Sequence, residues 1–202
     1  MRLAVLAAGF GLSITVLGAD PALIGVSAGA ARSDGSDRRS LQRIEDPEVH
    51  AVYAAVAAAE RHGAGAPVIV VAETYRHPYD PGDCVRATGQ ESNAWRVAID
   101  DYVRRSQAER IVPRNPPATR ALYVVLPLAE IRKRSRQSGA DIGYLALSDV
   151  GFDTGRTRAI VHRVHASALG ADGDGSDLFL EKQDGEWRLV KPAGVQGCGW
   201  IS

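Results

Sequence analysis

Residues 177–191 read DLFLEKQDGEWRLVK, and this stretch predicts a β-hairpin. Apolar and polar side chains alternate on both sides of Asp184-Gly185, a dipeptide that favours the two-residue turns of hairpins. Two earlier stretches show the same period of two, YLALSDVGFD at 144–153 and RTRAIVHRVHASA at 156–168. The C-terminal part of the chain is therefore expected to form a meander of four antiparallel strands.

The preceding part of the chain alternates helical and strand patterns. Helical spacing of apolar residues predicts helices that begin at Asp46 and Ser92, and a short third helix at 127–137. Two β-branched apolar runs, at 66–74 and 121–126, predict buried strands, and the second has the two apolar faces of a central strand. We expect an α+β fold, in which an antiparallel sheet with a C-terminal four-strand meander carries two main helices on one face.

The N-terminus has the layout of a secretory signal peptide. Arg2 precedes an apolar run, and small residues accumulate up to Ala30, which predicts a signal peptide at 1–30. An uncleaved membrane anchor is the alternative, because the run is only just long enough to span a bilayer. Residues 31–45 are polar and predict a flexible linker, and 46–202 predict a single domain. The mature protein is then secreted or periplasmic and has no transmembrane span.

Charge and composition narrow the kinds of partner. The chain has 24 basic and 24 acidic residues, so its formal net charge is zero. A neutral chain gives no reason to expect nucleic acid as a partner. No metal or cofactor motif is present in the sequence, which predicts neither a metal site nor a cofactor.

Cys84 and Cys198 are the only two cysteines of the chain. In a protein that is exported to an oxidising compartment, such a pair predicts a disulfide, which here would tie the C-terminal tail to the loop after residue 74. The competing interpretation is a nucleophilic thiol with a nearby base. His77 is the only histidine close in sequence to either cysteine.

The C-terminal half resembles a family of uncharacterised secreted proteins. The resemblance rests on LSDVGFD at 147–153, on Ala159–Val161 and on LEKQDGEW at 180–187. This family brings no known activity, so the resemblance implies a secreted protein without naming its function. Helices followed by a C-terminal meander are also similar to the NTF2-like cone, a likeness that concerns the fold alone.

Three residues are candidates for chemistry. Glu73 stands where the strand at 66–74 enters a loop, a position in which apolar neighbours can make a carboxylate a general base. His162 lies on the more apolar face of its predicted strand, and Arg120 precedes another strand as a candidate anion clamp. A lone histidine on such a face is more often a satisfied core residue than a ligand, and the Glu73 carboxylate could equally hydrogen-bond the loop backbone.

Possible metal ligands are not diagnostic in their spacing. His77, Asp80 and Asp83 share a loop whose prolines and glycine are also those of an ordered turn. His162 and His165 are three apart on a strand and so point to opposite faces. DGDGSD at 172–177 lacks the glycine and glutamate of a calcium loop and predicts a flexible hairpin tip.

Two hypotheses for function follow from these observations. The first is a secreted or periplasmic domain that binds a small ligand or a partner protein of the cell envelope. The second is a metal-independent hydrolase or lyase that uses Glu73 as base, His162 as its partner and Arg120 as the anion clamp. The sequence does not decide whether the protein is an enzyme.

Overall fold

The computed structural model describes residues 41–61, 66–88, 93–114, 122–170 and 173–201. The predicted signal peptide, most of the predicted linker and Arg120 lie outside these ranges. The elements in chain order are α1 (Pro47–Glu60), β1 (Val68–Val71), the 3-10 helix η2 (Pro81–Asp83), β2 (Arg86–Ala87), α2 (Asn93–Arg105), β3 (Tyr123–Leu126), α3 (Leu128–Ser138), β4 (Gly143–Leu147), β5 (Gly151–Phe152), β6 (Arg158–Ser167), β7 (Gly173–Gln183), β8 (Glu186–Val190), β9 (Val195–Gln196) and β10 (Gly199–Ile201).

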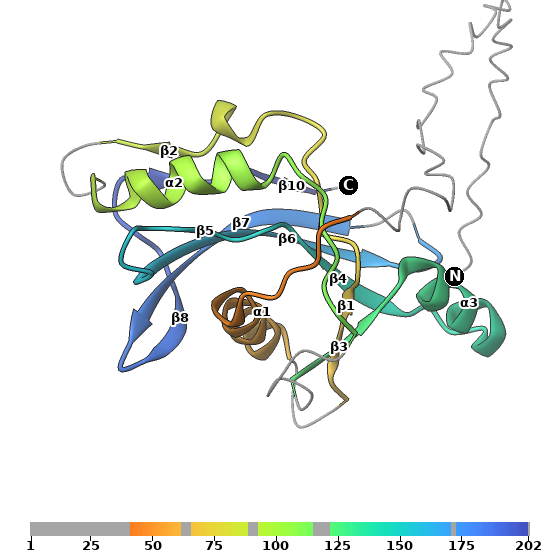
Figure 1. Ribbon diagram of the computed structural model, residues 1–202. Helices are drawn as coiled ribbons and strands as arrows, with labels where there is room; N and C mark the ends of the chain where they lie inside the picture. The colour runs from red at the N-terminus through yellow and green to blue at the C-terminus, as the bar shows by residue number, and fades with distance from the viewer. Residues whose placement is uncertain (1–40, 62–65, 89–92, 115–121, 171–172, 202) are drawn as a thin grey trace, which may run out of the picture. The chain divides into compact units, whose positions relative to one another are not determined.

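The main sheet is mostly antiparallel, with the order β10-β7-β6-β4-β1-β3. β5 pairs with β6 and β8 pairs with β7, so that β6, β7 and β8 form the meander (Figure 1). The β7–β8 turn has positive φ at Asp184 and Gly185, as the dipeptide predicts. β1 runs parallel to both β3 and β4. The predicted α+β class and the C-terminal meander are confirmed.

The two long helices pack against alternate residues of the meander. In one hydrophobic cluster α1 meets Ala159, Val161 and Leu180, and in the other α2 meets Ile160 and Phe179. Neighbouring residues of a strand point to opposite faces, so α1 and α2 cover different faces of the meander, as Figure 1 shows. This differs from the expected packing on one face. The physical reason is that β6 carries apolar side chains on both faces, so each face has to be shielded from water by a helix.

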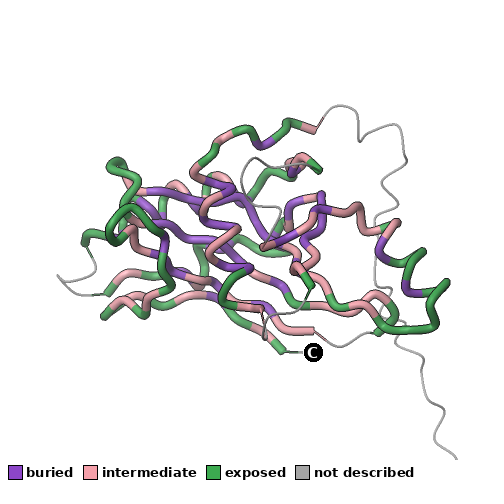
Figure 2. Tube along the Cα trace, turned by 90° about the horizontal axis from the view of Figure 1, so that it is seen from below, coloured by how far each residue is buried: buried purple, intermediate pink, exposed green. Residues whose placement is uncertain are grey.

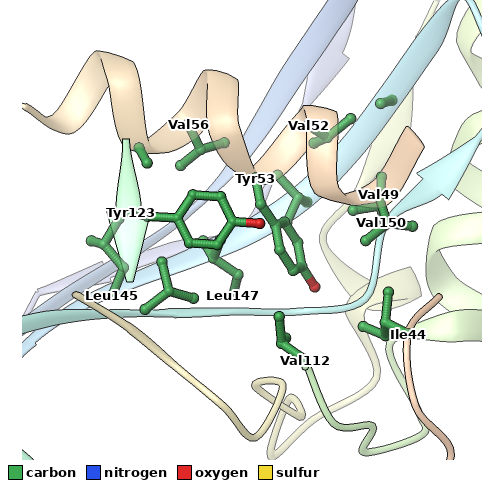
Figure 3. Close-up of a cluster of buried hydrophobic side chains, with 14 of the residues drawn as sticks. Ile44, Val49, Val52, Tyr53, Val56, Val112, Tyr123, Leu145, Leu147 and Val150 are labelled. Atoms are coloured by element: carbon green, nitrogen blue, oxygen red, sulfur yellow. The ribbon is translucent and has the colours of Figure 1, made fainter. Parts of the chain in front are cut away.

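The larger cluster forms the core between α1 and the sheet (Figure 3). Tyr53 and Tyr123 lie at its centre, and each places its hydroxyl on a polar partner. The Tyr53 hydroxyl donates to the Ser148 carbonyl oxygen at 2.7 Å, and the Tyr123 hydroxyl lies 3.3 Å from Nδ1 of His50. Buried segments follow the strands, whereas α3 is mostly exposed and buries only Ile131 and Ser135 (Figure 2).

The termini of the elements agree with the capping residues of the sequence. Asp46 caps α1 by accepting a hydrogen bond from the Glu48 amide, and Pro47 follows in the first turn. Gly139 ends α3 in the left-handed conformation, with φ 69°. These contacts place α1 and α3 within a few residues of the predicted bounds.

Four details differ from expectation. Ile44, in the predicted linker, is 3% exposed, and its amide donates to the Ile111 carbonyl, so packing begins before Asp46. The predicted strand at 144–153 is split into β4 and β5. β3 ends the strand order and is not central. Residues 173–177 belong to β7 and not to a hairpin tip.

Candidate functional sites

A surface pocket of about 490 Å³ lies where the parallel strands β1 and β3 end. Glu73 contributes a carboxylate to this pocket, and Arg43 and Arg114 contribute two guanidinium groups. Its remaining lining residues are Ala72, Ile111, Val112, Pro113 and Pro127. Small-molecule sites commonly combine apolar walls with a few charged or polar groups, as this pocket does.

Backbone pairing fixes the position of Glu73 in this pocket. Glu73 forms an isolated antiparallel bridge with Ile111, and Ile111 forms a parallel bridge with Arg43. On either side of Glu73, the Val112 amide donates to the Ala72 carbonyl at 2.8 Å and the Thr74 amide donates to the Arg110 carbonyl at 2.9 Å. The backbone at Glu73 is therefore held in a layer of three chain segments that come together only in the fold.

A second group of polar residues, which we call the histidine network, is buried under α2. It consists of His77, Tyr102, His162 and Asp177, all less than 9% exposed. His162 and Asp177 face each other as a cross-strand pair of β6 and β7. Tyr102 comes from α2, and His77 comes from the loop between β1 and η2. Four separate segments thus deliver one polar cluster to the interior.

Asp177 is the centre of the hydrogen bonds in the histidine network. Its Oδ1 lies 2.8 Å from Nδ1 of His162 and accepts from the Tyr102 hydroxyl at 2.7 Å. Its Oδ2 accepts from the Cys198 amide at 2.5 Å. Nε2 of His77 lies 2.6 Å from the Tyr102 hydroxyl. Asp177 therefore anchors His162 directly and His77 through Tyr102.

Burial sets the protonation states around this carboxylate. Burial is the main reason why the pKa of His77 is lowered to about 4. The nearby His162 lowers this pKa further, whereas Asp177 opposes the shift. Burial is also the main reason why the pKa of the Tyr102 hydroxyl is raised far above its ordinary value, and Asp177 raises it further. At neutral pH His77 is therefore uncharged, and Tyr102 keeps the proton that it donates to Asp177.

Aromatic rings and a glycine enclose the two histidines. Tyr75 stacks on His162 with ring centres 5.1 Å apart, and His77 meets His162 edge-on at 4.2 Å. A Cβ at Gly175 would collide with the Trp200 indole and would lie 2.9 Å from Nε2 of His162. Gly175 is thus the residue that leaves room beside this nitrogen.

The disulfide connects the two sides of the histidine network. Cys84 is bonded to Cys198, and their Cα atoms are 5.3 Å apart. Cys198 also pairs with Asp177 through its backbone, because the Asp177 amide donates to the Cys198 carbonyl at 2.9 Å. Cys84 ends the segment that carries His77. The predicted disulfide is confirmed, and it fixes the loop that carries His77 against the strand that carries Asp177.

The other sequence candidates fall in separate places. Asp80 caps η2 by accepting from the Gly82 amide at 2.9 Å, which is the part that an aspartate plays in an ordered turn. His165 is exposed, as its position on the strand predicts. The His162 ring contacts Tyr75, His77 and Asp177. Glu73 lies in the surface pocket, in different surroundings, and the joint catalytic role of Glu73, His162 and Arg120 stays a prediction.

The role of Asp177 was missed at the level of sequence. The DGDGSD segment reads as a flexible turn, which hides the fact that its last aspartate is a strand residue. A register of β6 against β7 drawn back to Gly173 would have placed Asp177 opposite His162. No local signal links His77 or Tyr102 to this pair, because the four residues are far apart in the chain.

Comparison with models of known families, with curated proteins and with solved structures finds no match. Among the residues that the structure describes, no helix is long and apolar enough to cross a membrane.

Proposed function

We propose that this chain is a binding domain of the secreted or periplasmic space, and that it binds a small ligand in the pocket of Glu73. The observation that carries the proposal is the pocket at the ends of β1 and β3. In parallel sheets, ligands usually bind outside the carboxyl ends of the strands, and β1 and β3 are a parallel pair within this mostly antiparallel sheet. The disulfide supports export, since such bonds persist in oxidising compartments.

The charges of the pocket define the class of ligand. Arg43 and Arg114 suit a carboxylate or phosphate group, since guanidinium pairs with both in a planar, charge-assisted manner. Glu73 suits an ammonium or hydroxyl group on the same molecule. The proposed ligand therefore carries an anionic group and a hydrogen-bond donor, as amino acids and sugar phosphates do.

Binding is preferred over catalysis because the two catalytic candidates have different neighbours. A general base acts only within hydrogen-bond reach of its partner or substrate. Glu73 lines a pocket with Arg43 and Arg114, whereas His162 is fully buried against Tyr75, His77 and Asp177. The two residues therefore lie in different surroundings, which does not favour a shared catalytic role.

A nuclear magnetic resonance screen with amino acids, small carboxylates and sugar phosphates tests the proposal. A true ligand shifts the amide signals of Ala72, Glu73 and 111–114, and it binds Glu73→Gln roughly tenfold or more weakly because a charged hydrogen bond is lost. Glu109→Gln, which changes an exposed carboxylate outside the pocket, should bind like the unchanged protein.

Three results would overturn the proposal. Shifts that map away from the pocket would place the ligand elsewhere. No binding from any class in the screen would favour a protein partner of the cell envelope. Turnover of ester, amide or phosphate substrates that disappears in Glu73→Gln would make the protein an enzyme.

A further inference from the structure

The histidine network leaves one ring nitrogen of each histidine unused. A carboxylate only accepts hydrogen bonds, so the Tyr102 hydroxyl and Nδ1 of His162 both donate to Asp177. Because the Tyr102 proton points to Asp177, the Tyr102 oxygen accepts from Nε2 of His77. Each histidine therefore uses one ring nitrogen in a hydrogen bond that stabilises the fold.

The two remaining nitrogens are buried. Within the described ranges, Nδ1 of His77 and Nε2 of His162 have no hydrogen-bond partner. A buried polar atom without a partner costs roughly 1–3 kcal/mol, so native proteins rarely leave two of them within one cluster. Their pairing on rings whose centres are 4.2 Å apart points to a bound species that uses imidazole nitrogens.

We propose that His77, His162 and Asp177 bind a single transition-metal ion of the zinc and copper class. One ligand atom from each of these residues lies within 4.8 Å of the other two, so one ion can contact all three after small adjustments. Because Asp177 contacts His162 at Nδ1, an ion that touches both residues binds this nitrogen in place of the hydrogen bond, and the ring proton moves to Nε2, which the fold does not use. This site is separate from the pocket of Glu73 and does not depend on the proposed function.

The donor set selects the kind of metal. Two imidazoles and one carboxylate suit zinc, copper, nickel or iron, whereas magnesium and calcium prefer a shell made of oxygen atoms alone. A Zn²⁺ ion normally has four ligands, of which these residues would supply three. A water molecule is available for the remaining position.

The surroundings hold the three ligands in place. Asp177 is oriented by the Cys198 amide at Oδ2 and by the Tyr102 hydroxyl at Oδ1, and outer contacts of this kind tune metal affinity. The disulfide between Cys84 and Cys198 restrains both the His77 loop and the partner of Asp177. The site is therefore preorganised by covalent and hydrogen bonds.

Titration of the intact, disulfide-bonded protein with Zn²⁺ by calorimetry, and with Co²⁺ by visible absorption, tests the proposal after removal of metal by a chelator. The expected result is one ion per chain, with an absorption band typical of nitrogen and oxygen ligands. His77→Gln should weaken binding by more than about a hundredfold, because losing a ligand exceeds the roughly 10–100-fold effect of losing an outer contact.

Matched variants separate this site from incidental binding. His165→Gln changes an exposed histidine on the same strand as His162 and should leave affinity unchanged. Tyr102→Phe should reduce affinity by roughly 10–100-fold through the loss of an outer contact. Equal losses in His77→Gln and His165→Gln would overturn the proposal, as would the absence of saturable binding of either metal.

A measurement on the unchanged protein covers the case in which His77→Gln does not fold. Long-range nitrogen spectra of the imidazoles should show Zn²⁺-induced shifts at His77 and His162 and none at His50, which lies against Tyr123 in the other cluster. Shifts confined to His165 would mean that the ion binds at the surface and would contradict the proposal.

Discussion

At the scale of single residues, Asp177 ties together three segments of the chain. One carboxylate accepts from a strand histidine, from the tyrosine of α2 and from the backbone of the C-terminal segment. Charged acceptors make stronger hydrogen bonds than neutral ones, and the effect is larger in a buried setting. The loss of this charge should therefore weaken the hydrogen bonds of all three segments.

Asp177→Asn should lower the free energy of unfolding by about 3 kcal/mol. An asparagine amide offers one oxygen in place of two, so at least one buried donor loses its partner. Asp174→Asn is the control on the same strand, since its ion pair with Arg163 is near the surface and such pairs contribute roughly 0–1 kcal/mol. Urea unfolding of both variants measures the difference, and equal losses would contradict the central role of Asp177.

His50 should make the protein less stable in acid. Burial lowers the pKa of His50 below its ordinary value of 6.5, although the Ile44 carbonyl and Asp46 oppose the shift. Between these two pKa values the unfolded chain binds a proton that the folded protein does not, so stability falls as pH drops below 6.5.

The pH dependence of urea unfolding in His50→Gln measures this contribution. The variant should lose part of the decline in stability below pH 6.5, whatever its stability at neutral pH. His165→Gln, at an exposed position, should keep the decline of the unchanged protein. A decline in His50→Gln as steep as in the unchanged protein would show that His50 does not contribute.

At the scale of elements, β5 and α2 approach closely at one glycine. A Cβ at Gly151 would collide with the backbone of Tyr102, which only a shift of the helix could relieve. Such a shift would move the tyrosine that links His77 to Asp177. The glycine of LSDVGFD thus helps to position the histidine network.

Gly151→Ala should destabilise the protein by roughly 1–3 kcal/mol, as overpacking commonly does. Gly155→Ala, in the turn that follows, places its Cβ 3.7 Å from Thr157 in ordinary contact and should change stability by less than about 0.5 kcal/mol. Thermal unfolding compares the two variants. A tolerated Gly151→Ala would mean that α2 does not approach β5 so closely.

Local patterns were enough to predict most elements but not their partners. The caps of α1, the Asp184-Gly185 turn and the period of two in β6 depend on neighbours in the sequence, so they could be read directly. The split between β4 and β5 arises at Asp149, which is fully buried and paired with Arg105 and Arg110 from elsewhere in the chain. Such long-range ion pairs leave no local pattern.

The candidate site was predictable in its parts and not as a whole. His77, His162 and the disulfide were each identified from the sequence, yet their meeting depends on the register of β6 with β7 and on the position of α2. Both are decided by packing on two faces of the sheet. Asp177 looked like a turn residue because glycine and aspartate dominate its local sequence.

At the scale of the whole molecule, the disulfide closes a loop between residues 114 positions apart. This loop contains α2, β3, α3 and the whole meander, so the bond restrains a large part of the unfolded chain. In the folded protein it joins the His77 loop to the C-terminal segment that holds Asp177. Stability and the histidine network should therefore weaken together when the bond is lost.

The double variant Cys84→Ser, Cys198→Ser should unfold with a free energy lower by roughly 2–5 kcal/mol. Its affinity for Zn²⁺ should also fall, since the loop of His77 loses its covalent restraint. The unchanged protein should show no alkylatable thiol in denaturant, because both cysteines are bonded. Two reactive thiols, or an unchanged unfolding midpoint in the double variant, would contradict this account of the bond.

Anomalous diffraction from crystals grown with Zn²⁺, with data collected on both sides of the zinc absorption edge, tests the proposed metal site. One anomalous peak is expected in contact with His77, His162 and Asp177. A peak only at exposed side chains such as His165, or an ordered water molecule between the two imidazoles in zinc-soaked crystals, would contradict it.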